Sequence, residues 1–344
     1  MAKDVIELAE EIEKLEPEEK AIIMEIIESG NSWVPDITNF LNNQRMSEKR
    51  VCPICGSEHT VKNGKRSDGV QRYHCKECNH YFVMSTNSIL FGTRKDLSAW
   101  IKFIECSLDN NSLKLTAEKC GIHKNTALNW RHKLQESVST IQKEKLSGVI
   151  EMDEAYQDIS YKGNHSNNKD FIMPREPRKR GSESTKRGLS SDKVCIPCAV
   201  SENGIAEGKI AKCGAVSYEG LSCVFGKERI SELSTIVSDD ASSYIRLAED
   251  CRSELIQIPT GQHVLDGYNI QKVNSFHTSL KNLINHVYRG VSTKHLNGYI
   301  AWTAFTFKKN RLELKIRLLK LLASEFFDTV RNILLHPIVP VLVR

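Results

Sequence analysis

Two short apolar runs in this chain end in acidic residues. Residues 149–152 lead into Asp153, and residues 236–238 lead into Asp239. Such β-prone runs predict buried strands, and carboxylates at strand ends are hard oxygen ligands suited to Mg²⁺ or Mn²⁺. Each aspartate taken alone could simply end a strand. Taken together, they predict a catalytic site that binds magnesium or manganese through Asp153 and Asp239.

Four cysteines form two pairs with the spacing of metal ligands. Each pair is a C-x₂-C motif, and the two pairs predict a zinc ribbon over residues 47–84. Four thiolates close a tetrahedral shell and leave no open position for a substrate, so we expect this Zn²⁺ to be structural. The predicted ligands are Cys52, Cys55, Cys75 and Cys78.

Residues 94–143 have the pattern of a helix-turn-helix. Ala117 is small enough for a close helix crossing, Gly121 suits the turn, and Asn125 or Thr126 can cap the second helix. The alternative is a three-helix connector with no groove contact. On the first interpretation the side chains expected to face DNA are Lys124, Asn125, Asn129, Arg131 and Lys133.

The composition favours a basic protein with an acidic front. The 344 residues have a net charge of +5. Residues 1–50 hold six Lys/Arg against twelve Asp/Glu, a net of −6, so the remainder carries +11. A basic body suggests a polyanionic partner. No apolar run approaches the ~20 residues needed to cross a bilayer, and the eleven cysteines include four with metal spacing. We therefore expect a cytoplasmic protein with no membrane partner.

The rest of the chain predicts a multidomain α/β protein. Residues 1–46 and 311–344 are expected to be helical regions, and residues 148–310 a core with a mixed sheet and a basic insertion at 162–193. The succession of strand, hairpin, helix, strand, strand and helix is of the ribonuclease-H type. His277 and Lys281 fall four residues apart on one helix face of that core.

Other acids near the two strand ends are weaker candidates. Glu151, Glu154 and Asp240 are close in sequence but are expected on other sides of their strands or turns. We therefore rank them below Asp153 and Asp239.

Together these motifs resemble the zinc-ribbon insertion-sequence transposases of the ISXO-like, DDE-superfamily type. The resemblance covers about residues 48–310, including the cysteine pairs, residues 152–156, Ser238-Asp239, residues 273–281 and residues 289–294. It implies binding of terminal inverted repeats and metal-dependent strand cleavage and transfer.

The resemblance also assigns roles. It makes Asp153 and Asp239 the first two metal-binding acids, whereas His277 occupies the position where the third acid is usually Glu. Asn274 is the alternative for that position. Lys281 matches a lysine that would hold a DNA phosphate, although it could also be a solvated helix lysine.

The expected partners are double-stranded DNA, both element ends and target, and further copies of the chain in a homo-oligomer. No small-molecule substrate is expected. A second hypothesis is a domesticated DNA-binding regulator that keeps the ribbon and the helix-turn-helix without the chemistry. The missing third carboxylate favours this regulator, and the two retained aspartates argue against it.

Overall fold

The computed structural model describes residues 17, 20, 51–67, 70–83, 85–141, 144–163, 172 and 192–323. The described residues fall into two compact units, one drawn from the chain up to residue 137 and again from 310, the other from 138–309. Apart from the helical residues 17 and 20, the predicted helical region 1–46 lies outside the described residues. None of the described helices is long and apolar enough to span a bilayer.

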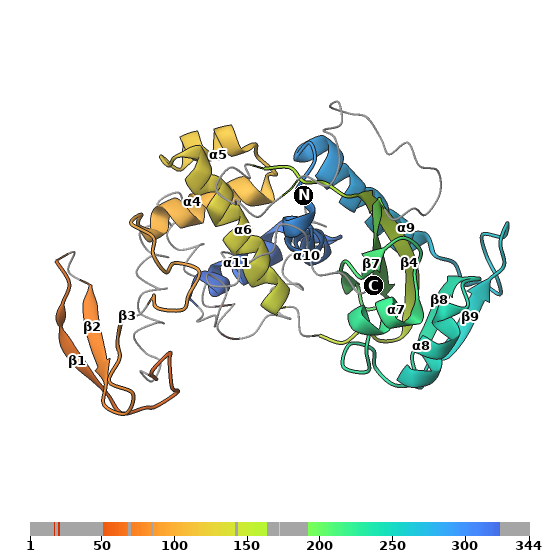
Figure 1. Ribbon diagram of the computed structural model, residues 1–344, viewed down its shortest axis with the longest axis horizontal. Coiled ribbons are helices and arrows are strands. Elements are labelled where there is room, and N and C mark those ends of the chain that lie inside the picture. The colour runs from red at the N-terminus through yellow and green to blue at the C-terminus, as the bar shows by residue number, and fades with distance from the viewer. Residues whose placement is uncertain are drawn as a thin grey trace. The chain divides into compact units, whose positions relative to one another are not determined.

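A small antiparallel sheet begins the first unit (Figure 1). Its strands are β1 (Thr60–Lys65), β2 (Gln71–Cys75) and β3 (Tyr81–Val83), in that order. The buried side chains of Tyr73 and Phe82 stack with ring centroids 5.5 Å apart beside the buried Cys52 and Cys75. This small core holds the sheet against the cysteine turns.

Helices α4 (Leu97–Leu108), α5 (Leu113–Lys119) and α6 (Lys124–Ile141) follow. Asp96 and Ser112 cap α4 and α5, each accepting a hydrogen bond from a backbone N–H of the first turn. Gly121, with φ +58°, turns the chain between α5 and α6. The stacked rings of Trp100 and Trp130, 4.0 Å apart, join α4 to α6.

The last described helix, α11 (Arg311–Ala323), follows the second unit in sequence but packs against α4 of the first unit. Lys315 Nζ lies 2.9 Å from Glu105 Oε1, and Arg311 Nη1 lies 2.7 Å from Asp109 Oδ1. The start of the predicted helical region 311–344 thus belongs to the same compact unit as α4; residues 324–344 lie outside the described part.

The second unit is built on a mixed sheet of six strands. They are β4 (Val149–Asp158), β5 (Lys193–Ser201), β6 (Ala206–Gly208), β7 (Lys212–Cys213), β8 (Thr235–Asp239) and β9 (Glu254–Ile258). The order is β6-β5-β4-β8-β9, with β7 also paired to β5. Strand β4 is antiparallel to β5 and parallel to β8, so it lies at the junction between the two kinds of pairing. The predicted mixed sheet is confirmed.

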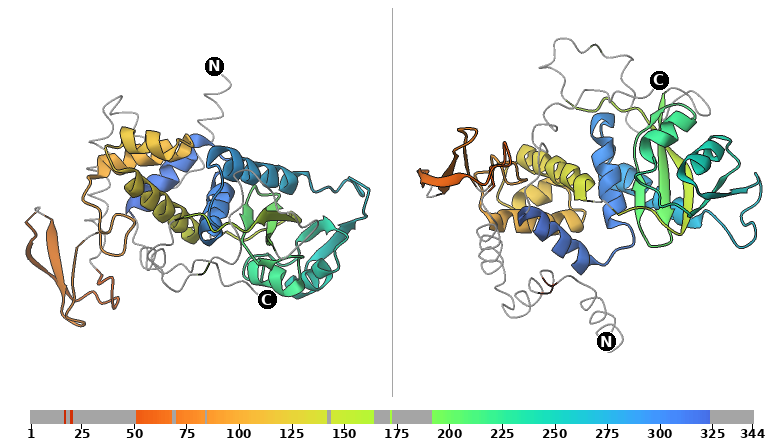
Figure 2. Two further views of the ribbon diagram at one scale, coloured as in Figure 1. Left: turned by 45° about the horizontal axis from the view of Figure 1, so that its top comes forward. Right: turned by 90° about the horizontal axis from the view of Figure 1, so that it is seen from below.

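Helices cover both faces of this sheet (Figure 2). On one face lie α9 (Gln271–Asn282) and α10 (Leu296–Thr306), joined by the π-helix Leu283–Val287 and the 3-10 helix Thr293–His295. On the other face lie α7 (Tyr218–Val224) and α8 (Ser243–Cys251). Side chains of β4 alternate between them: Ala155 packs toward α9, and Met152 toward α8.

The basic insertion predicted at 162–193 lies for the most part outside the described residues. Its first residue, Lys162, is described and donates from Nζ to the backbone carbonyls of Arg289 and Gly290, at 3.1 and 2.6 Å. These contacts hold the end of the β4 segment against the chain that precedes α10.

Candidate metal centres and DNA-contacting residues

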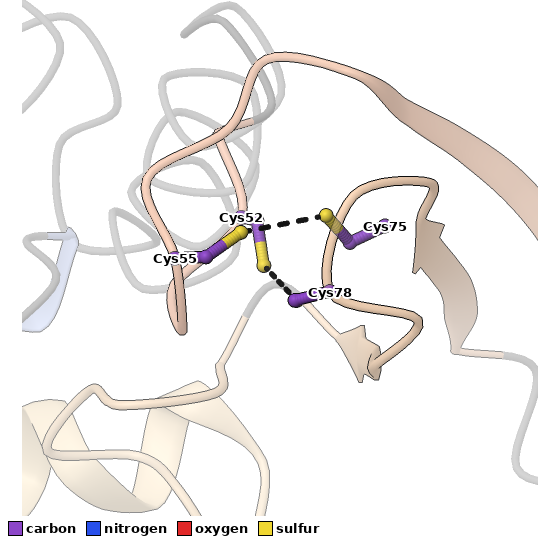
Figure 3. A group of neighbouring side chains, drawn as sticks. All are labelled: Cys52, Cys55, Cys75 and Cys78. Carbon is purple, nitrogen blue, oxygen red and sulfur yellow. Dashed lines mark hydrogen bonds between the residues drawn. The ribbon is translucent and has the colours of Figure 1, made fainter.

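The four predicted zinc ligands lie together at the base of the small sheet (Figure 3). Sγ of Cys52 is 3.5 Å from Sγ of Cys78, Sγ of Cys55 is 3.6 Å from Sγ of Cys75, and all four sulfurs lie within 4.8 Å of one another. Tetrahedral zinc with bonds of ~2.3 Å places its sulfurs ~3.8 Å apart. A disulfide would need ~2.05 Å. The four residues therefore fit Zn²⁺.

Asp239 is the last residue of β8, but Asp153 lies in the middle of β4. The prediction that Asp153 ends its strand is corrected, because antiparallel pairing with β5 continues β4 to Asp158. Parallel pairing of β4 with β8 sets Glu151 opposite Val237, and two residues further along the same register come Asp153 and Asp239. A third carboxylate joins them, because ligand oxygens of Asp153, Glu154 and Asp239 all lie within 4.8 Å of one another. Three hard oxygen donors at this spacing suit Mg²⁺ or Mn²⁺.

This carboxylate group is partly removed from water, which changes its protonation. Burial is the largest effect on Asp153 and raises its pKa to about 6. The charge of Asp239 also raises this pKa, whereas the hydrogen bond from the Glu154 backbone N–H and the charge of Lys281 lower it. Burial likewise raises the pKa of Glu154 to about 7, against the hydrogen bond from Tyr244. A bound divalent cation would favour the ionised forms of both carboxylates, against the burial that raises their pKa values.

Helix α9 brings the predicted histidine to Asp153. His277 is buried, and its Nδ1 lies 3.8 Å from Asp153 Oδ2. Burial and the charge of Lys281 lower the pKa of His277 to about 4, so the ring is neutral near pH 7. Lys281 is exposed one turn later, and its charge acts on both Asp153 and His277. Asn274, the alternative for the third position, is exposed on the same helix.

A buried acid holds α9 against the strand. The carboxylate Oε2 of Glu151 accepts hydrogen bonds from the backbone N–H groups of Lys272 and Val273, at 2.5 and 3.2 Å. These two N–H groups have no acceptor within the helix, and together with the positive end of the helix dipole they stabilise a negative charge on Glu151. Glu151 thereby ties the helix that carries His277 to the strand that carries Asp153.

The sequence argument missed the site position of Glu154. Its side chain points to the α8 side of the sheet, where the buried Tyr244 hydroxyl donates to Oε1. Strand alternation does place Asp153 and Glu154 on opposite faces of β4. Both lie beside the end of β8, however, and each has a carboxylate oxygen within 4.8 Å of one oxygen of Asp239. The sequence signal that could have identified Glu154 was its position directly after Asp153.

The predicted DNA-contacting side chains on α6 divide into two groups. Lys124, Asn125 and Asn129 are exposed. Arg131 is buried and its Nη2 donates to the backbone carbonyl of Asn111 at 2.9 Å. Lys133 Nζ donates to the carbonyl of Phe91 at 2.9 Å, and burial lowers the Lys133 pKa. The expectation that Arg131 faces DNA is therefore corrected, because its side chain is buried and bonded to the Asn111 carbonyl. Lys133 is partly buried, and its contact with DNA stays a prediction.

Comparisons with known proteins address the second unit. Residues 145–310 match the family model described as ISXO2-like transposase domain. No curated protein matches the chain. This region is the one in which Asp153, Asp239, His277 and Lys281 lie.

Several solved structures are similar to the chain at a low level. One is a pre-cleavage Mos1 transpososome, with 12% identity, a TM-score of 0.25, and 67% of this chain and 77% of that chain covered. The Mos1 Strand Transfer Complex has 12% identity and a TM-score of 0.27 with the same shares covered. The Mos1 mariner paired end complex with Mn has 14% identity and a TM-score of 0.26, again covering 67% and 77%.

Proposed function

We propose that this chain, which carries an ISXO2-like transposase domain at residues 145–310, is a DNA transposase that binds the terminal inverted repeats of an insertion sequence and cuts and transfers its strands. The observation that carries the proposal is the meeting of Asp153, in the middle of β4, with Asp239, at the end of the parallel strand β8, within that domain. The strand order, with an antiparallel half and a parallel half joined at β4, supports a ribonuclease-H-like core.

The residues of the core would divide the work of strand cleavage. Asp153 and Asp239 would hold Mg²⁺ or Mn²⁺, which when bound activates the attacking hydroxyl and stabilises the leaving oxygen. His277, neutral and 3.8 Å from Asp153 Oδ2, would orient that carboxylate or complete its ligand set. Lys281, exposed beside them, would hold a phosphate of the DNA near the carboxylates.

The first unit would find the DNA. Helices α5 and α6, with the turn at Gly121, would form the helix-turn-helix, and the exposed Lys124, Asn125 and Asn129 at the start of α6 would meet the base edges. The zinc ribbon would add phosphate contacts. Because two element ends must be joined, we propose that the protein acts as a homo-oligomer.

Separate substitutions in the two units test this division. We expect Asp153→Asn to bind duplex DNA carrying the element's ends with wild-type affinity but to cut it at least about a hundredfold more slowly in Mg²⁺, because a ligand of the activating ion is lost. The double substitution of Lys124 and Asn129 to alanine should instead weaken binding. Asp153→Asn cutting at the wild-type rate would refute the site.

The second candidate function is a DNA-binding regulator without strand chemistry. The observation that favours it is that α9 carries His277, and no carboxylate, opposite Asp153. In the same assay, a wild-type protein that binds the ends and never cuts them in Mg²⁺ or Mn²⁺ would support the regulator.

A further inference from the structure

We infer that Glu154 supplies the third carboxylate of the metal site, in place of the acid that α9 lacks, and that Tyr244 positions it. This inference rests on the proposed function, because it concerns the same metal site. The twelve residues of α9 (Gln271–Asn282) contain no Asp or Glu. Within the described part of the chain, the acid grouped with Asp153 and Asp239 is Glu154.

The geometry of β4 allows two adjacent acids to serve one site. Asp153 and Glu154 lie on opposite faces of the strand, so Asp153 meets His277 of α9 while Glu154 meets Tyr244 of α8. The backbone N–H of Glu154 donates to Asp153 Oδ1 at 2.8 Å, which holds the aspartate carboxylate beside the next residue. Asp239, on the adjacent strand, lies within reach of both carboxylates. The ligand set therefore approaches from both faces of the sheet.

Tyr244 fixes which oxygen of Glu154 remains available. The tyrosine is completely buried in the core between α8 and the sheet, and its hydroxyl donates to Oε1 of Glu154. A rigid donor on one oxygen orients the carboxylate and leaves Oε2 to bind a cation. Hydrogen bonds from neighbouring groups orient metal ligands in this way in many metal sites.

The charge of the group agrees with this role. Asp153 and Asp239 alone would bring two negative charges to a site for divalent cations, and a neutral His277 adds none. Ionised Glu154 brings the total to three, the same charge as a site whose third acid is on α9. The number of charged oxygen ligands is one of the properties that set affinity for hard cations. The competing interpretation is that Glu154 merely accepts the Tyr244 hydrogen bond.

Mn²⁺ binding to the full-length protein separates these interpretations. Titration followed by electron paramagnetic resonance reports free Mn²⁺, and zinc in the ribbon gives no signal. Glu154→Gln keeps the shape and an acceptor for Tyr244 but removes the charge, and we expect it to weaken Mn²⁺ binding at least about tenfold. Tyr244→Phe should also weaken it about tenfold while the protein stays folded. Asp240→Asn, the same kind of change one residue beyond Asp239, should leave affinity unchanged.

Asp153→Asn shows which part of the account fails. If Glu154→Gln binds Mn²⁺ like the wild type while Asp153→Asn does not, the inference about Glu154 is overturned and the proposed site remains. If Asp153→Asn also binds like the wild type, the metal site of the proposed function is itself wrong. A loss in Asp240→Asn equal to that in Glu154→Gln would reduce the effect to general charge and likewise overturn the inference.

Discussion

Glu151 gives a prediction whose size follows from its contacts. Its buried carboxylate accepts from two N–H groups at the start of α9, and Lys272 Nζ lies 3.9 Å from its other oxygen. Glu151→Gln keeps an acceptor but loses the charge at the helix N-terminus, which costs about 1–2 kcal/mol for a buried geometry. Glu151→Ala leaves both donors without their acceptor, at about 1–3 kcal/mol each.

Hydrogen exchange of the α9 backbone is the suitable assay, because unfolding of a protein with two units need not be two-state. A loss of 1–2 kcal/mol accelerates exchange that requires opening of α9 by about 5- to 30-fold, since 1.4 kcal/mol is a factor of ten. We expect Glu151→Gln to show this acceleration in peptides covering Gln271–Asn282, and Glu151→Ala to exceed it. Peptides from α4, in the other unit, should be unchanged.

Glu202→Gln is the matched control. Glu202 also accepts a backbone hydrogen bond, from Val149 N at 3.2 Å, but it is exposed. The Glu202→Gln variant should show the same hydrogen exchange in α9 as the wild type. Unchanged α9 exchange in Glu151→Ala would refute the reasoning that Glu151 ties the helix to β4.

Three further outcomes are expected. Metal analysis of the purified protein should find one zinc per chain, and Cys75→Ser should lose it; a zinc-free wild type with a folded ribbon would contradict the assignment. Mn²⁺ affinity should rise at least about tenfold from pH 5 to pH 7, because the ion must displace protons from Asp153, with a pKa of about 6, and Glu154, with a pKa of about 7; a flat titration would oppose these values. Lys281→Ala should slow strand cleavage about tenfold or more while Mn²⁺ still binds, measured on DNA carrying the element's ends, and a wild-type rate would leave Lys281 as a solvated lysine.

Local patterns were sufficient to predict the main elements of the site. The apolar runs before Asp153 and Asp239 correctly predicted strands, and the spacing of His277 and Lys281 correctly placed them on one helix. Cysteine spacing identified the four clustered sulfurs. The apolar runs, the helical spacing and the cysteine spacing can all be read directly from the sequence, so these features were predictable without knowledge of tertiary contacts.

The features that were missed depend on tertiary packing. Glu154 joins the carboxylates because β8 pairs with β4 in a particular register, and Glu151 acts as a cap only because α9 begins above it. The inward turn of Arg131 depends on the packing of α6, and no sequence period showed that α11 returns to α4. Each of these requires knowledge of which segments meet.

The most direct test of the central claim compares two neighbouring aspartates. Asp239 belongs to the carboxylate group, whereas Asp240, the next residue, is exposed and is not a member of it. Single-turnover cleavage of DNA carrying the element's ends should be lost in Asp239→Asn and kept in Asp240→Asn, in both Mg²⁺ and Mn²⁺. Equal cleavage by the two variants would contradict a metal-dependent transposase site at Asp153 and Asp239.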